Sequence, residues 1–121
     1  MEFIIEFYEN KEGKCSVREF LDDLKASDPD DFVAVMAGLA KLRHRHYHRP
    51  PLSKPIGDGL LELRHVGKLN TRVLYFFMKG RRIIAVHGIR SKGWEITARD
   101  KNAALARKND WLARQNNENK N

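Results

Sequence analysis

The chain has a single cysteine, Cys15, so it cannot form an intrachain disulfide or a cysteine-based zinc cluster. It lacks any apolar run of about 18 residues, the length that a membrane-spanning helix needs. Glu2 interrupts the only apolar stretch near the start, so we expect no secretory signal either. Gly57 and Gly59 are not followed by the Gly-Lys-Ser/Thr of a phosphate-binding loop. The lone cysteine favours a protein of a reducing, cytosolic setting.

The apolar content is sufficient for one folded domain. Hydrophobic residues make up 41% of the 121 residues, which excludes a wholly disordered chain. The length suits one domain and is too short for two ordinary ones. We expect residues 1–114 to form that domain and residues 115–121 to form a polar, disordered tail.

Acidic residues are scarce in the middle of the chain. The formal net charge is +7, but its distribution is uneven. Residues 1–40 carry four Lys or Arg and ten Asp or Glu, whereas residues 41–92 carry thirteen and two. Residues 93–121 carry six Lys or Arg and four Asp or Glu. Such a basic segment usually contacts a polyanion, of which nucleic acid is the first candidate. The alternative is a cationic face that contacts only water.

Helical periodicity predicts two helices in the first half of the chain. Ser16 and Glu19 have the spacing of a capping box and open a helix over about residues 16–25. Asp28 and Pro29 open a second helix, whose apolar stripe leads us to extend it to about residue 47. Two adjacent helices of opposite dominant charge indicate a helical hairpin with a basic far end.

Strand-forming residues predict four strands, over residues 2–8, 60–64, 71–78 and 82–89. Lys79 and Gly80 make a tight hairpin plausible between the last two strands. Thr97, with Asp100 three residues later, opens a last helix. The order β-α-α-β-β-β-α predicts an α+β domain in which helices pack against an antiparallel sheet.

Residues 52–97 contain three motifs in succession: LSKPIGDGLLELR, TRVLYFF and IIAVHGIRSK. With the element order and the length, this succession resembles the RelE/ParE superfamily of toxins from bacterial type II toxin–antitoxin pairs, above all its HigB-like, phage-associated branch. The N-terminal strand and helices agree with that branch in the order of their elements rather than in their amino-acid sequence. The resemblance implies a RelE-like fold and a toxin that cleaves messenger RNA, usually in the decoding site of the ribosome. It also implies a neighbouring antitoxin, often of the helix-turn-helix type, that keeps the toxin inactive.

Metal-free RNA cleavage requires a proton acceptor for the 2′-OH, a cation for the developing phosphate charge and help for the leaving 5′-oxygen. Arg72 is the first catalytic candidate, because it occupies the position of the arginine that RelE-like enzymes carry at the start of the central strand. Arginine also binds phosphate through parallel donors. The alternative is that Arg72 lies at the open end of the strand and extends to solvent.

His87 is the second catalytic candidate, because imidazole exchanges protons near neutral pH. A two-residue turn at 79–80 would place His87 directly opposite Arg72, whereas a one-residue slip would put them on opposite faces. The alternative is a packed histidine that hydrogen-bonds to backbone. Arg90 and Lys92 complete the catalytic candidates, because they follow the strand where the family tends to place further basic residues.

The stretch 63–94 holds eight Lys or Arg and no Asp or Glu, and we expect it to contact phosphates. Trp94 either stacks on a base or packs under the last helix. The RNA-binding candidates, which include two arginines at the end of the second predicted helix, are Lys54, Arg64, Lys68, Arg82, Trp94, Arg43 and Arg45.

No metal or other cofactor is expected. His44 and His48 have helical spacing, but arginines flank them and no carboxylate or cysteine lies nearby in the sequence. Glu62 stands in the strand where RelE offers lysines implicated in proton transfer. It can serve as a base in principle, but pairing with a neighbouring arginine is simpler. Two other functions therefore stay open: inhibition of DNA gyrase, as by ParE-like toxins, and nucleic-acid binding without catalysis.

Overall fold

The structure is a computed structural model, and it describes residues 2–119. It is an α+β fold, which confirms the predicted class. The elements are β1 (Ile4–Phe7), α1 (Ser16–Ser27), α2 (Pro29–Lys41), a 3-10 turn (Arg45–Tyr47), β2 (Ser53–Gly57), β3 (Leu60–Val66), β4 (Asn70–Met78), β5 (Arg82–Ser91) and α3 (Ala98–Asn119). The predicted order omitted β2, because Pro55 and Gly57 weaken its strand signal.

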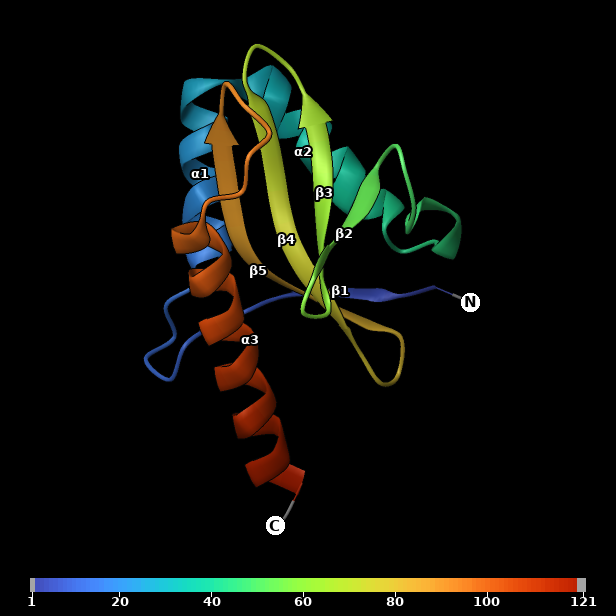
Figure 1. Cartoon of the computed structure of the whole chain (residues 1–121), viewed down its shortest axis with the longest axis vertical. Coiled ribbons are helices and arrows are strands. Elements are labelled where there is room, and N and C mark those ends of the chain that lie inside the picture. Colours follow the sequence, from blue (N-terminus) through green and yellow to red (C-terminus); the bar gives the residue numbers. More distant parts are fainter. Residues whose placement is uncertain (1, 120–121) are drawn as a thin grey trace.

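The five strands form one sheet in the order β1-β5-β4-β3-β2. All neighbours are antiparallel except β1 and β5, which are parallel, so the sheet is mixed and the prediction of an antiparallel sheet was wrong at this edge. The direction of β1 has no local signal, because no hairpin links it to β5. In Figure 1, α1 and α2 lie behind the sheet and α3 lies in front of it.

Each face of the sheet has its own hydrophobic core. The face toward α1 and α2 buries Leu63, Val73, Tyr75, Ile83 and Ala85 against Val17, Leu21, Leu24, Val35, Leu39 and Leu42. The face toward α3 buries Leu60, Leu74, Phe76, Ile84, Val86 and Ile89 with Ala104 and Tyr8. Because successive strand residues point to opposite faces, each position of β4 and β5 belongs to one of these two environments.

The helix starts were predicted with mixed success. The Asp28 side chain accepts the Asp31 N–H at 3.2 Å and Pro29 is the first residue of α2, as the sequence predicts. Thr97 Oγ1 accepts the Asp100 N–H at 3.1 Å at the start of α3, which is also confirmed. The predicted capping box at Ser16 was wrong, because Cys15 is the N-cap residue and no side chain caps α1.

Two helix ends also differ from the prediction. α2 ends at Lys41, one residue before Leu42, the last buried residue of its apolar stripe, instead of near residue 47. α3 extends through Asn119, beyond residue 114, where we expected the domain to end. The rest of the predicted tail, residues 120–121, lies outside the described residues. Within residues 2–119, no helix combines the length and apolar character needed to cross a membrane.

The β4–β5 hairpin has an unexpected register. Its turn contains three residues, 79–81, because Met78 pairs with Arg82. An odd turn would place Arg72 and His87 on opposite faces. A bulge shifts the register between Leu74 and Tyr75, and this one-residue shift returns the two side chains to the same face. Arg72 pairs with Ile89 and His87 with Leu74, so the predicted direct opposition of Arg72 and His87 was wrong.

Candidate functional site

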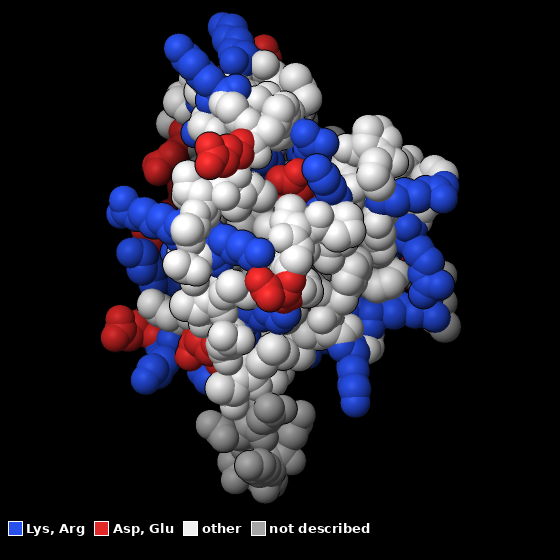
Figure 2. All heavy atoms as spheres, in the orientation of Figure 1, with Lys and Arg blue, Asp and Glu red and all other residues white. Residues whose placement is uncertain are grey.

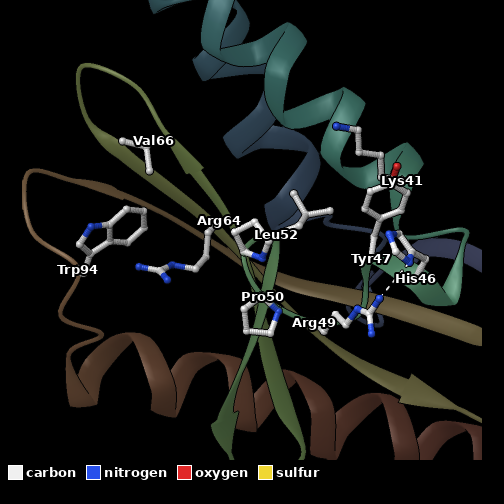
Figure 3. A pocket seen from close by; sticks show the side chains of 10 residues that line it. Lys41, His46, Tyr47, Arg49, Pro50, Leu52, Arg64, Val66 and Trp94 are labelled. Atoms are coloured by element: carbon white, nitrogen blue, oxygen red, sulfur yellow. Dashed lines mark hydrogen bonds between the residues drawn. The ribbon is translucent and has the colours of Figure 1, made fainter.

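A groove of about 630 Å³ opens between the connection from α2 to β2 and the ends of β3 and β5. Its chemistry is cationic and aromatic, and its lining contains no Asp or Glu. The lining residues that define it are Lys41, Tyr47, Arg49, Arg64, Val66 and Trp94. Figure 3 shows Arg64 and Trp94 pointing toward one another on one side, with Lys41, Tyr47 and Arg49 on the other. Two of the predicted RNA-binding residues, Arg64 and Trp94, therefore line one groove.

Trp94 covers two arginines that are cross-strand neighbours. Arg64 of β3 pairs with Arg72 of β4, and both lie on the α3 face of the sheet. The guanidinium carbon of Arg64 lies 4.1 Å from the centre of a Trp94 ring, and that of Arg72 lies 5.5 Å from it. Both distances fit cation–π attraction. Trp94 thus packs on these two arginines.

Arg72 is fully buried, contrary to the interpretation that it extends to solvent. Its guanidinium donates to Ser91 Oγ at 2.6 Å and to the Glu95 carbonyl at 3.3 Å, while its buried Nε has no hydrogen-bond partner. Burial lowers the pKa of Arg72, and the negative charges of Glu62 and Asp100 oppose that shift. A buried guanidinium held mainly by neutral acceptors retains capacity to bind an anion.

Glu62 is the carboxylate next to these arginines, and it is only 4% exposed. One oxygen lies 3.3 Å from Arg64 Nε, which confirms the simpler interpretation that Glu62 pairs with an arginine. The other oxygen is buried without a hydrogen-bond partner in the described part of the chain. Two guanidinium groups therefore lie against the indole of Trp94, and an incompletely bonded carboxylate lies beside one of them.

His87 is held by two residues of α3. Its Nε2 lies 2.9 Å from Asp100 Oδ1, and Arg107 donates to its Nδ1 at 2.7 Å. Because a guanidinium can only donate, Nδ1 is the acceptor, and the N–H of His87 is on Nε2, where it donates a hydrogen bond to Asp100. Burial raises the pKa of Asp100, but hydrogen bonds from His87 and Thr97 outweigh it and lower the pKa overall. Both ring nitrogens of His87 are thus engaged in anchoring α3 to β5.

Arg90 and Lys92 are not brought to the groove. Arg90 lies on the opposite face of the sheet and donates to Asp28 at 2.9 Å and Asp31 at 3.1 Å. His65 also bonds to Asp31, at 3.0 Å. Burial raises the pKa of Asp31, but the hydrogen bonds from His65 and Arg90 outweigh it, so its pKa lies below the usual value. Lys92 is exposed just beyond the end of β5.

The remaining predicted cations are dispersed. Lys54 is exposed on the edge strand β2, and Lys68 is exposed in the turn between β3 and β4. Arg82 forms two hydrogen bonds with Glu6, at 2.6 and 2.9 Å, at the end of β5 remote from Ser91. Arg43 pairs with Glu2 at 2.6 Å, and Arg45 lies 6.0 Å from the Phe3 ring centre. None of these five lines the groove.

Sequence reasoning missed Lys41, Tyr47 and Arg49 as groove residues. The basic block at 41–49 was recognised, but the helix predicted to run to residue 47 concealed how these side chains converge. A 3-10 turn and Pro50-Pro51 instead reverse the chain there. The histidines of this block point to different partners: His48 Nε2 lies 2.6 Å from the Leu42 carbonyl, and His46 lies 3.1 Å from Arg49. No group of three potential metal ligands is found within residues 2–119.

A comparison with known protein families identifies the family of this chain. Residues 19–109 match the family model described as phage derived protein Gp49-like (DUF891). The chain belongs to the Gp49-like family. This family is associated with RelE-like and toxin-like proteins, which agrees in part with the resemblance inferred from the motifs. The match spans α2, the basic connection and all the strands that line the groove of this Gp49-like protein. No curated protein matches the chain.

Proposed function

We propose that this Gp49-like protein is the toxin of a type II toxin–antitoxin pair, an endoribonuclease that cleaves messenger RNA on the ribosome without a metal ion. Membership of a family associated with toxin-like proteins supports the toxin role. The observation that carries the ribonuclease role is the cationic, aromatic groove that ends at Trp94, directly over Arg64 and Arg72.

The groove has the chemistry that single-stranded RNA requires. Aromatic side chains such as Tyr47 and Trp94 stack on unpaired bases, while lysine and arginine contact the phosphates between them. The lining contains no carboxylate to repel those phosphates. A strand that stacks a base on Trp94 would draw the indole from the arginines and place a phosphate beside them.

We assign the chemical roles to the two arginines under Trp94 and to the neighbouring Glu62. Arg64 and Arg72 stabilise the extra negative charge that develops on the phosphorus oxygens. Glu62, with one oxygen lacking a partner, accepts the proton of the 2′-OH as that oxygen bonds to phosphorus. The bond from phosphorus to the 5′-oxygen breaks, and the leaving 5′-oxygen takes a proton from solvent, which gives a 2′,3′-cyclic phosphate and a 5′-OH. The Glu62 pairing with Arg64 orients the carboxylate toward the same phosphate. His87 has no catalytic role in this scheme, because both its nitrogens bond to α3.

The proposed partners follow from the same chemistry. The ribosome would present the message, because a domain of 121 residues has little room to read codons itself. The cognate antitoxin, which we propose to be of the helix-turn-helix type, would cover part of the basic surface with acidic side chains. Both interactions would take place in the cytoplasm.

The test is induced expression of the protein with and without the adjacent gene, followed by mapping of RNA ends. We expect growth arrest with new cleavage sites in translated messages, relieved by the adjacent gene. Glu62→Gln should reduce cleavage strongly, whereas Arg99→Gln, at an exposed cation in the first turn of α3, should not. Arrest with intact RNA and a DNA-damage response would instead identify a gyrase inhibitor. RNA binding without cleavage would identify a non-enzymatic module.

A further inference from the structure

A second aromatic surface lies outside the groove. Phe77, near the end of β4, is 40% exposed, although Val73 and Tyr75 on the same face are completely buried. The ring centre of Phe77 lies 5.8 Å from that of Phe3 and 5.0 Å from that of His48. Phe77 is the exposed ring of this group, and the half-buried rings of Phe3 and His48 pack against it; we call the three rings the aromatic platform.

Cations flank the platform from two separate segments. Arg45 lies over the Phe3 ring, and Lys79 and Arg81 follow Phe77 in the β4–β5 turn. The backbone joins these segments, because Phe3 N–H donates to the Arg43 carbonyl and Ile4 N–H donates to the Arg81 carbonyl, both at 2.8 Å. In Figure 2, Lys and Arg follow one another down the right-hand flank, where Figure 1 shows the connection from α2 and the β4–β5 turn.

The platform adjoins the groove through the basic connection. Lys41, Tyr47 and Arg49 of this connection line the groove, whereas Arg45 and His48 contact the platform rings. Residues 41–57 contain no Asp or Glu. A polyanionic strand can therefore pass from the groove to the platform without meeting an acidic side chain of this segment.

The exposed Phe77 ring between cations favours an unpaired nucleic-acid strand over other partners. A base stacks on the ring, and the adjacent phosphates meet the flanking cations. An acidic protein would use the cations but would gain little from Phe77. We propose that the aromatic platform is a second RNA-binding surface, which holds unpaired nucleotides outside the groove. The choice of RNA rests on the proposed function.

The test is binding of a labelled single-stranded RNA of about twenty nucleotides, 2′-O-methylated so that it cannot be cleaved, measured by anisotropy at several salt concentrations. Phe77→Ala should weaken binding by about tenfold with an unchanged salt slope, because stacking releases no counterions. Arg45→Gln with Lys79→Gln should weaken binding and reduce the salt slope by about 1.4, or 0.7 for each phosphate contact.

The matched control is Lys14→Gln with Arg99→Gln, which removes two exposed cations far from Phe77 in the sequence. We expect its affinity to stay within about twofold of the wild type, with the slope unchanged. Thermal unfolding shows whether each variant is folded. If the platform variants bind like this control while the wild type cleaves messages, the platform proposal fails and the ribonuclease function stands. If binding depends on the platform but no message is cleaved, the platform stands and the ribonuclease function fails.

Discussion

The variant Arg72→Met tests whether Arg72 is a catalytic or a structural residue. Arg72 is fully buried, and its hydrogen-bond acceptors include Ser91 Oγ and the Glu95 carbonyl. Within residues 2–119 it forms no ion pair with a carboxylate, and its Nε has no partner. A charge desolvated in this way costs folding free energy, so a protein retains it where function needs it.

Arg72→Met should change the activity far more than the free energy of unfolding. Replacing a buried charge by an apolar side chain of similar length is often neutral or stabilising by about 1–4 kcal/mol. Each hydrogen bond that the variant loses reduces this stabilisation by about 1 kcal/mol. Because Arg72 donates three hydrogen bonds, we expect Arg72→Met to change the free energy of unfolding by between about −2 and +1 kcal/mol. Cleavage should fall by about 10²–10³-fold, the usual effect of removing one donor that stabilises transition-state charge.

The assay pairs denaturant unfolding with cleavage of ribosome-bound message. Arg90→Met is the matched control, because it strands the Asp28 and Asp31 carboxylates on the other face. This variant should lose about 2–4 kcal/mol of stability and keep its cleavage rate where it remains folded. If Arg72→Met lowered the free energy of unfolding by several kcal/mol while cleavage persisted, Arg72 would be structural and our reasoning would be refuted.

Three further predictions concern the surroundings of the site. Trp94→Ala should weaken RNA affinity by about tenfold, measured by anisotropy, because a stacking surface is lost; an unchanged affinity would exclude stacking. Asp31→Asn should lower the free energy of unfolding at pH 7, and urea titrations should show this difference shrinking as the pH falls below about 4. The reason is that the lowered pKa of Asp31 contributes stability in full above the unfolded pKa, near 3.9, and this contribution is lost as the pH falls toward the lower folded pKa. Gly88→Ala should destabilise by about 1–3 kcal/mol, because the added Cβ would lie 2.4 Å from the Phe20 ring; Phe20→Leu should recover part of that loss in a double-mutant cycle.

Local signals in the sequence predicted what depends on nearby residues. The starts of α2 and α3 were predicted because each capping side chain and its amide lie three residues apart. The strand β2 was missed because its Pro55 is tolerated only at an edge, and whether a strand lies at an edge is not a local property. Likewise, α2 was extended too far because the reversal after Lys41 depends on how the following connection packs.

By itself, the sequence determined the α+β class, the basic middle of the chain and the candidates Arg64, Arg72 and Trp94. The class and the basic middle follow from periodicity and composition, and the three candidates follow from the charge pattern and the family resemblance. Only the tertiary structure decided that Trp94 covers both arginines, that Arg90 lies on the other face, and that His87 is held by α3. The physical reason is that one additional residue in a turn or a bulge moves the following side chains to the other face of the sheet. The hydrophobic periodicity of the sequence does not reveal such a residue.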